Sequence, residues 1–334
     1  MVARSRTSDE VLAAKRSVTE ADATPLEKAE MLMEMAMGIQ QKPKTPDDLL
    51  AAVDLYEDAL TVCGALDALL AARIRARMAT ALMSIPSDDM AFHVKAKEAM
   101  EVALATISAE GKDEEIAEAE MNLGLICQNL AGVGMGKIQD AISAYQRSLR
   151  VFDKTKFPAE FAILQNNLAT AFLSIPFSDD SGKMREALAV QSFEEGLRVV
   201  NLIDHPTEYA MLQNNLGNAL QYASSSHRIE NGFRALEAYE EALKVRNETD
   251  TPGEYANTIA NKANCLSNLP DDPEDPEKGN TNNLMKALGL YHEARKIFLA
   301  VGETQKAQMV GDAASEVQAL LSSADSPETL QTIQ

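Results

Sequence analysis

Apolar and polar positions along this chain follow helical spacing, and one pattern recurs six times. An Ala is followed after three residues by a large residue, after two more by a small residue, and then by Leu, as in Ala141/Tyr145/Ser148/Leu149; in the sixth copy Arg295 replaces the Leu. Spacing of i, i+4, i+7 and i+8 puts all four on one helical face. The large residues are Tyr56, Met100, Tyr145, Phe193, Tyr239 and Tyr291. The pattern predicts six helices that each pack closely against a partner helix.

A second repeated sequence motif identifies the partner helices. Pro158–Leu168 returns as Pro206–Leu216, and a third copy begins at Pro252. Copies that begin at residues 158, 206 and 252 have the spacing of a helical-hairpin repeat. The Pro at the start of each copy separates one hairpin from the next. Thr24-Pro25 with Glu27 predicts the first helix start through a capping box, and Thr251-Pro252 repeats that signal. The predicted hairpins are 24–63, 66–108, 112–154, 157–201, 205–247 and 251–301, with a terminal capping helix near 303–320.

These elements predict an all-α chain without sheet. We expect a flexible N-terminal tail over 1–22, one repeat solenoid over 23–321 and a flexible C-terminal tail over 322–334.

The net charge of the chain limits the classes of partner that it could bind. The 334 residues include 31 Lys and Arg against 51 Asp and Glu, a formal charge of −20. Such a surface disfavours nucleic acid and anionic membranes, and weakly favours a basic partner. No apolar stretch approaches the roughly 20 residues of a membrane span, and no signal peptide is evident. The three cysteines form no CxxC motif. This predicts buried free thiols in a reducing compartment, so we expect a cytoplasmic protein.

Catalytic chemistry has little support in the sequence. The four histidines fall in different repeats, and none has a second His or a Cys at i+3 or i+4 that would complete a metal site. The glycines of 132–137 fail the spacing of a phosphate loop, and the acidic turns at 84–89, 174–180 and 268–277 lack the spacing of a calcium loop. We predict no enzyme activity, no cofactor and no metal site.

Asparagine recurs at one position of the first helices. Asn122, Asn167, Asn215 and Asn261 are 45, 48 and 46 residues apart. Asn costs several tenths of a kcal/mol against Ala in a helix, so its repeated use needs a reason. Either the amides bind the C=O and N–H groups of an extended peptide, or each bonds the adjacent repeat and sets the stacking. The same faces carry Asn166, Met211, Asn214, Asn218, Asn257 and Asn264 as further candidate contacts.

Two arginines occupy the corresponding face of the second repeat. Aligning Met83–Pro86 with Leu173–Pro176 places Arg73 and Arg77 at the positions of Ile163 and Asn167. Like charges at i and i+4 repel unless an anion lies between them, and Arg fits a carboxylate bidentately. The pair is a candidate carboxylate clamp for a chain terminus. The alternative is that the arginines pair with acids such as Glu118.

These motifs resemble the tetratricopeptide repeat (TPR). Asn167–Ala171 and Asn215–Ala219 match its first helix, and the Ala/Tyr/Ala-Leu pattern matches its second. The Gln-Asn-Asn-Leu phrase with long turns resembles the expanded bacterial repeats found with caspase-like (CHAT) proteases. The resemblance implies a right-handed superhelical solenoid of about six hairpins, with first helices lining a concave groove. It also implies asparagine and arginine contacts to peptides in that groove, and binding in place of catalysis.

Together these features lead us to expect a non-catalytic scaffold or adaptor that binds another protein or an extended peptide segment. The alternative is a regulatory subunit or inhibitor of a separately encoded caspase-like protease, or an accessory chaperone for an enzyme complex.

Overall fold

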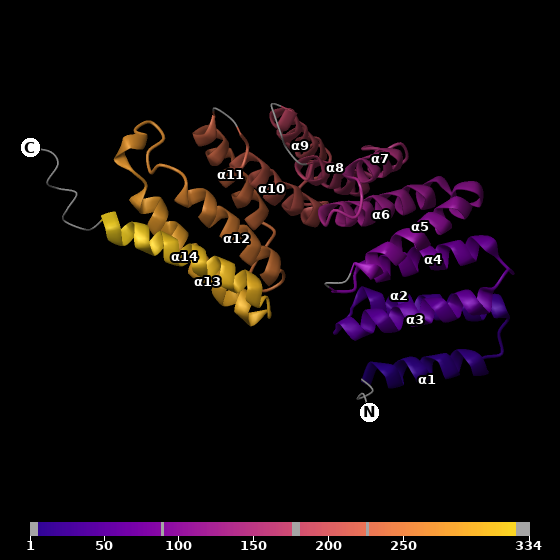
Figure 1. Cartoon of the computed structure of the whole chain (residues 1–334). Helices are drawn as coiled ribbons and strands as arrows, with labels where there is room; N and C mark the ends of the chain where they lie inside the picture. Colours follow the sequence, from indigo (N-terminus) through magenta and orange to yellow (C-terminus); the bar gives the residue numbers. More distant parts are fainter. Residues whose placement is uncertain (1–5, 88–89, 176–180, 225–226, 325–334) are drawn as a thin grey trace, which may run out of the picture. The chain divides into compact units, whose positions relative to one another are not determined.

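The computed structural model describes residues 6–87, 90–175, 181–224 and 227–324, and every element within these ranges is helical (Figure 1). The elements are α1 (Arg6–Glu20), α2 (Pro25–Gln41), α3 (Pro46–Cys63), α4 (Ala68–Met83), α5 (Ala91–Glu110), α6 (Asp113–Gly132), α7 (Ile138–Ser148), α8 (Pro158–Leu173), α9 (Ser181–Leu197), α10 (Pro206–Gln221), α11 (Arg228–Leu243), α12 (Pro252–Ser267), the short 3-10 helix η1 (Pro276–Lys278), α13 (Thr281–Ala300) and α14 (Thr304–Ala324).

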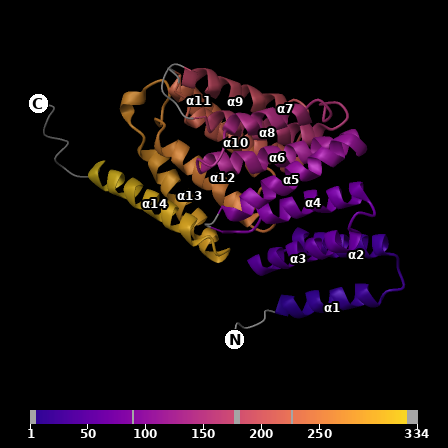
Figure 2. The same cartoon turned by 45° about the vertical axis from the view of Figure 1, so that its right-hand side comes forward.

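The chain divides into two compact units, Met1–Asp153 and Lys154–Gln334. The interval 23–321, predicted as one solenoid, therefore spans both units. Consecutive helices pack in pairs within each unit (Figure 2). The pairs are α2/α3, α4/α5 and α6/α7 in the first unit, and α8/α9, α10/α11 and α12/α13 in the second. The six predicted hairpins and the all-α class are confirmed.

In the third and fifth hairpins, the ring of a Tyr in the second helix meets a Gly of the first helix. A Cβ added to Gly124 would lie 2.5 Å from Tyr145 Cε1, and one added to Gly217 would lie 2.6 Å from Tyr239 Cε1. Both rings are fully buried. Because a carbon atom cannot occupy that space, the absence of a side chain at each Gly sets how closely the two helices approach.

The buried tyrosines also need a hydrogen-bond partner, and the first helix supplies it four residues after the small residue. Tyr145 donates to Gln128 Oε1 at 2.8 Å, and Tyr239 donates to Gln221 Oε1 at 2.8 Å. Tyr56 donates in the same way to Gln40 at 2.8 Å. This relation aligns all six first helices through their buried small residues: Ala36, Ala79, Gly124, Ala169, Gly217 and Ala263.

In two hairpins the residue equivalent to Tyr145 has no hydroxyl group. The residue equivalent to Gln128 is then apolar as well. The second hairpin has Met100 and the fourth has Phe193, both fully buried. Four residues after the small residue these hairpins carry Met83 and Leu173 in place of Gln. The two positions therefore match each other in polarity, which leaves no buried hydroxyl unpaired at this point of these hairpins.

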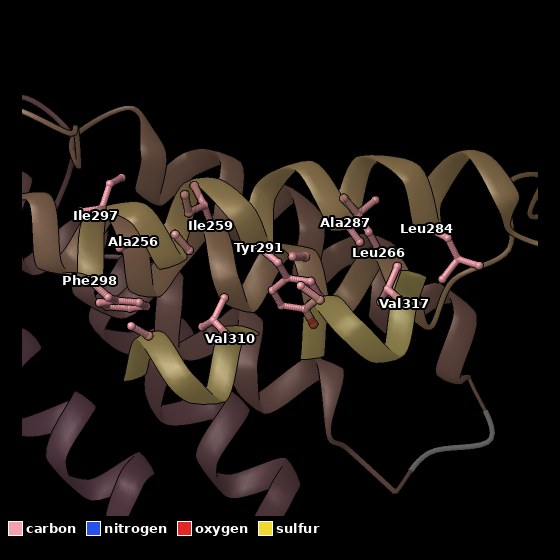
Figure 3. Packing of buried hydrophobic residues seen from close by; sticks show 14 residues of the cluster. Ala256, Ile259, Leu266, Leu284, Ala287, Tyr291, Ile297, Phe298, Val310 and Val317 are labelled. Carbon is pink, nitrogen blue, oxygen red and sulfur yellow. The ribbon is translucent and has the colours of Figure 1, made fainter. Parts of the chain in front are cut away.

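Helix α14 packs on the last hairpin, as the predicted capping helix should. Figure 3 shows Val310 and Val317 of α14 beside Tyr291 and Phe298 of α13. All four side chains are buried within one apolar cluster. Lys306 adds a cation–π contact, with its Nζ 5.7 Å from the centre of the Phe298 ring. The helix thereby covers apolar surface that the last repeat would otherwise expose.

The N-terminal region differs from the flexible tail expected over 1–22. Helix α1 forms there and contacts α2 and α3. Its Val11 and Val18, seven residues apart, are buried, and Lys15 Nζ lies 2.7 Å from Asp58 Oδ2 on α3. Two apolar residues in a polar segment are a weak sequence signal, which is why the helix was missed. At the other end, residues 322–324 complete α14, and 325–334 lie outside the described residues.

The two capping signals have different outcomes. The capping box at Thr24 is present, with the Glu27 carboxylate accepting from the Thr24 amide at 2.7 Å. The corresponding prediction for Thr251 is wrong, because Thr251 Oγ1 accepts from the Asn247 amide at 3.1 Å. The Asn247 side chain in turn accepts from the amides of Thr249 and Asp250 and holds the loop between hairpins as an Asx turn.

We expect Gly217→Ala to destabilise the second unit by about 1–3 kcal/mol, because the new methyl group would overlap the buried Tyr239 ring. The matched control is Gly289→Ala, where nothing lies within 4 Å of the added carbon and the helix gains up to about 1 kcal/mol. Thermal unfolding followed by circular dichroism compares the two. Equal melting temperatures for both variants would contradict this account of helix spacing.

Alkaline pH should weaken the fold through the same tyrosines. Burial raises the pKa of Tyr56 to about 12, and it raises the pKa of Tyr145 and of Tyr239. A raised folded-state pKa stabilises the protein below the unfolded value of about 10, and this contribution is lost as pH rises towards the folded value. Urea unfolding should therefore give a lower free energy at pH 11 than at pH 8. The drop should be smaller in Tyr56→Phe, and an unchanged drop would count against a buried phenol there.

Candidate functional site on the first helices

The predicted binding residues occupy a recurring position, two residues before the buried small residue of each first helix. In the second unit this position holds Asn167, Asn215 and Asn261, and each is half-buried. In the first unit the equivalent residues are Glu34, Arg77 and Asn122, of which the two charged ones are exposed. We call the surface formed by this position and its neighbours the first-helix face. Its chemistry differs between the units, with amides in one and mainly charges in the other.

In the second unit the asparagines form a continuous hydrogen-bonded series, which we call the amide chain. Asn261 Nδ2 donates to Asn214 Oδ1 at 3.2 Å, and Asn214 Nδ2 donates to Asn215 Oδ1 at 3.0 Å. Asn215 Nδ2 then donates to Asn166 Oδ1 at 2.8 Å, and Asn166 Nδ2 donates to Asn167 Oδ1 at 3.3 Å. The chain runs from α12 through α10 to α8 and so links three successive repeats.

Burial separates the two kinds of member in the amide chain. Asn166 and Asn214 are each 7% exposed, whereas Asn167, Asn215 and Asn261 are only half-buried. A carboxamide has two N–H hydrogens and two acceptor lone pairs. The chain uses one donor and one acceptor of each of its three inner members. The stacking contact is therefore present in the structure, and the predicted peptide contacts of these residues stay a prediction.

The remaining predicted amides lie nearer the ends of their helices. Asn218 Oδ1 lies 2.7 Å from the Tyr239 hydroxyl oxygen and shares the single hydrogen of that hydroxyl with Gln221. Asn264 Nδ2 donates to the hydroxyl of Tyr222 at 2.5 Å, and this Tyr is 67% exposed. Asn257 and Met211 are half-buried on α12 and α10. The second unit thus combines amides with an accessible aromatic ring.

In the first unit the structure brings three predicted residues together. Arg73 and Arg77 from α4 and Asn122 from α6 line one pocket of about 160 Å³. Helix α2 contributes Glu34 to the same pocket, so three successive first helices build it. Apolar side chains complete the wall, among them Met33, Met37 and Ile107. We call the cavity lined by these residues the unit 1 pocket.

The arginines of the unit 1 pocket already have acidic partners. Arg73 binds Glu115 bidentately, with Nε 2.8 Å from Oε1 and a terminal nitrogen 3.2 Å from Oε2. That hydrogen bond holds the pKa of Glu115 below its ordinary value, so Glu115 is ionised at neutral pH. Arg77 lies 3.8 Å from Glu118, a longer pair between exposed side chains. The alternative raised from the sequence, pairing with nearby acids, is the arrangement in this structure.

A series of hydrogen bonds connects the first hairpin to Thr80, which lines the unit 1 pocket. Tyr56 donates to Gln40, and Gln40 Nε2 donates to Thr80 Oγ1 across the first two repeats at 2.9 Å. Thr80 then donates to the Arg77 carbonyl at 2.8 Å. This series joins the ring that closes the first hairpin to the helix that carries the arginines, which makes the pocket wall part of the repeat packing.

Sequence reasoning missed two acids of the pocket. Glu34 occupies the recurring position of the first repeat, but that repeat lacks the Asn-Leu phrase that identified the others. The signal available was the pairing of Tyr56 with Gln40, which aligns Ala36 with Gly124 and so places Glu34 at the position equivalent to Asn122. Glu115 was not singled out because it lies in the acidic first turn of α6, where charge has a capping role.

A second pocket, of about 500 Å³, is lined chiefly by the second helices α9 and α11. Its walls include Val190 and Leu220. Two further lining residues form an ion pair, in which a terminal nitrogen of Arg234 lies 3.0 Å from Glu194 Oε1. The volume falls in the range of small-molecule sites, about 300–1,000 Å³. Basic and acidic residues are equal in number along its lining, so charge gives it no preference.

The described residues offer little for metal chemistry. Among them, no group of three or more His, Cys, Asp or Glu side chains could hold a metal ion. Of the acidic turns, Asp88, Asp89, Asp179 and Asp180 lie outside the described residues. In the described turn, Asp271 accepts from the amides of Asn282 and Asn283 and caps α13. None of the described helices combines the length and apolar character needed to cross a membrane.

Comparison with known proteins addresses the fold. No protein-family model and no curated protein matches the sequence. A signal transduction ATPase with a tetratricopeptide repeat sensor, from Pyrococcus horikoshii, aligns over 91% of this chain with a TM-score of 0.58 and 15% identity. This chain spans 42% of the length of that ATPase. The helical hairpins of this protein therefore have a TPR-like fold.

Two further solved structures align over more of their own length. BtubC from P. vanneervenii aligns over 96% of this chain and 93% of its own, with 17% identity and a TM-score of 0.44. The Rap protein complexed with competence and sporulation factor aligns over 95% of this chain and 81% of its own, with 11% identity and a TM-score of 0.49.

The amide chain predicts a stability cost at Asn214. Asn214→Ala would leave Asn261 Nδ2 and Asn215 Oδ1 without the partner that joins them, at a cost of about 1–3 kcal/mol. Asn257→Ala, one helical turn before Asn261 on α12, is the matched control and should gain a few tenths of a kcal/mol. Urea denaturation of both variants measures the difference. If Asn214→Ala were as stable as the control, the amide chain would have no role in stacking.

Proposed function

We propose that this protein is a non-catalytic scaffold that binds an extended segment of another protein along the first-helix face. The observation that carries the proposal is the unit 1 pocket, in which equivalent positions of three successive repeats converge. A repeat fold presents such positions at regular intervals, so neighbouring residues of an extended chain meet similar surroundings. The fold supports the same role, because stacked helical hairpins supply extended binding surfaces.

Each unit offers its own set of contacts for such a segment. The unit 1 pocket supplies charge and methionine, and methionine adapts to differently shaped apolar partners. The second unit supplies half-buried amides with both donors and acceptors, which match the main chain of a bound peptide. Tyr222 adds an exposed ring of the kind enriched in protein interfaces.

The alternative role, as a regulator of a separately encoded caspase-like protease, depends on the Gln-Asn-Asn-Leu phrase. In the structure the asparagines of that phrase form the amide chain between repeats. Stacking is thus a sufficient reason for the phrase, and it does not favour a protease partner over any other protein. We therefore propose the scaffold role without a named partner.

Photo-crosslinking tests the scaffold role. A photoreactive amino acid at Met37, in the unit 1 pocket, should form an adduct with a partner protein in cells of the native host. The same replacement at Leu50, an exposed residue of α3 in the same hairpin, is the matched control. Mass spectrometry should place the Met37 crosslinks within one short contiguous stretch of the partner. Equal yields from both positions, or crosslinks scattered over the partner surface, would refute binding at this face.

A further inference from the structure

We infer that the unit 1 pocket accepts a basic side chain, Lys or Arg, with an apolar neighbour, from the bound segment. This inference rests on the proposed function and gives the chemistry of its guest. It replaces the carboxylate guest that the sequence suggested for Arg73 and Arg77. Three observations lead to it: the charge balance of the pocket, the state of its arginines and its size.

The charge balance of the pocket is negative. Its lining contains two arginines against Glu34, Glu115 and Glu118, so the formal charge is −1. A carboxylate guest would add to this excess of negative charge, whereas an ammonium or guanidinium group would neutralise it. The chain as a whole carries a formal charge of −20, which acts in the same direction on an approaching partner.

Arg73 already has a carboxylate partner, which weakens its attraction for a second one. Arg73 already uses the fork of its guanidinium on both oxygens of Glu115. A second carboxylate would find only the remaining N–H groups of a guanidinium whose charge is already paired with Glu115. Glu118 is different, because its carboxylate is 50% exposed and lies 3.8 Å from Arg77. Glu34 is likewise exposed, so these two acids can turn to a cationic guest.

The size of the pocket fits one side chain. Its volume of about 160 Å³ is below the roughly 300–1,000 Å³ of pockets that enclose a small molecule. Met33, Met37 and Ile107 supply apolar surface for the methylene stem of Lys or Arg. Long basic side chains characteristically place the stem on apolar surface and the charge at its edge. The pocket therefore selects by charge and by an apolar contact together.

Peptide selection tests this inference on the full chain. A random-peptide display library is selected on the protein, and the enriched peptides are made with a fluorescent label for anisotropy measurements. We expect enriched peptides with Lys or Arg beside an apolar residue. The double variant Glu34→Gln/Glu118→Gln should bind them about threefold to tenfold more weakly, since exposed ion pairs each contribute modestly. Added salt should reduce the difference between variant and parent.

The matched control carries the same change in net charge on the second helices of the first two hairpins. Glu57→Gln/Glu98→Gln removes two exposed acids from α3 and α5 and should leave binding unchanged. If the enriched peptides were acidic, or needed a free terminal carboxylate and lost affinity in Arg73→Gln/Arg77→Gln, the basic guest would be refuted and the scaffold role kept. Basic peptides insensitive to Glu34→Gln/Glu118→Gln would refute this pocket as their site. Absence of any enriched peptide would count against the scaffold role itself.

Discussion

The close approach of two helices at a residue with little or no side chain is the constraint on which the rest of this structure depends. In each of the third and fifth hairpins a buried tyrosine ring occupies the space where a glycine Cβ would be. The hydroxyl of the ring then finds its partner one turn further along the first helix. This one contact thus fixes the distance between the two helices, the rotation of the first helix about its axis, and the position of its polar partner residue. The orientation of every other residue on the first helix follows from it.

One consequence is the alternation of buried and accessible residues at the candidate site. Asn166 and Asn214, three residues before the small residue, face the interior and are almost fully buried. The next residue in each helix, Asn167 or Asn215, is half-buried. A buried amide needs a partner, and the amide of the adjacent repeat supplies it. The amide chain therefore joins stacking to the first-helix face, and substitutions there change both stability and surface chemistry.

Much of this architecture follows from local sequence. Apolar spacing, proline positions and the recurrence of Tyr or another large residue were enough to place six hairpins and the capping helix. Helix α1 was missed because Val11 and Val18 alone do not outweigh a polar segment. The pairing of Arg73 with Glu115 was missed for a different reason. The two residues lie 42 positions apart in neighbouring repeats, and the residue pattern does not show which of several acids the guanidinium reaches.

The contrast between the units shows how a repeat fold changes its specificity without changing its packing. The same helical position carries Glu34, Arg77 and Asn122 in one unit and three asparagines in the other. Amides bonded to each other are electrically neutral and favour a peptide main chain, which every sequence shares. Charges favour particular side chains, and their net sign decides which ones. Because Glu115 already pairs with Arg73, the exposed acids Glu34 and Glu118 outnumber the remaining Arg77, and under the proposed function the unit 1 pocket would select its guest by charge.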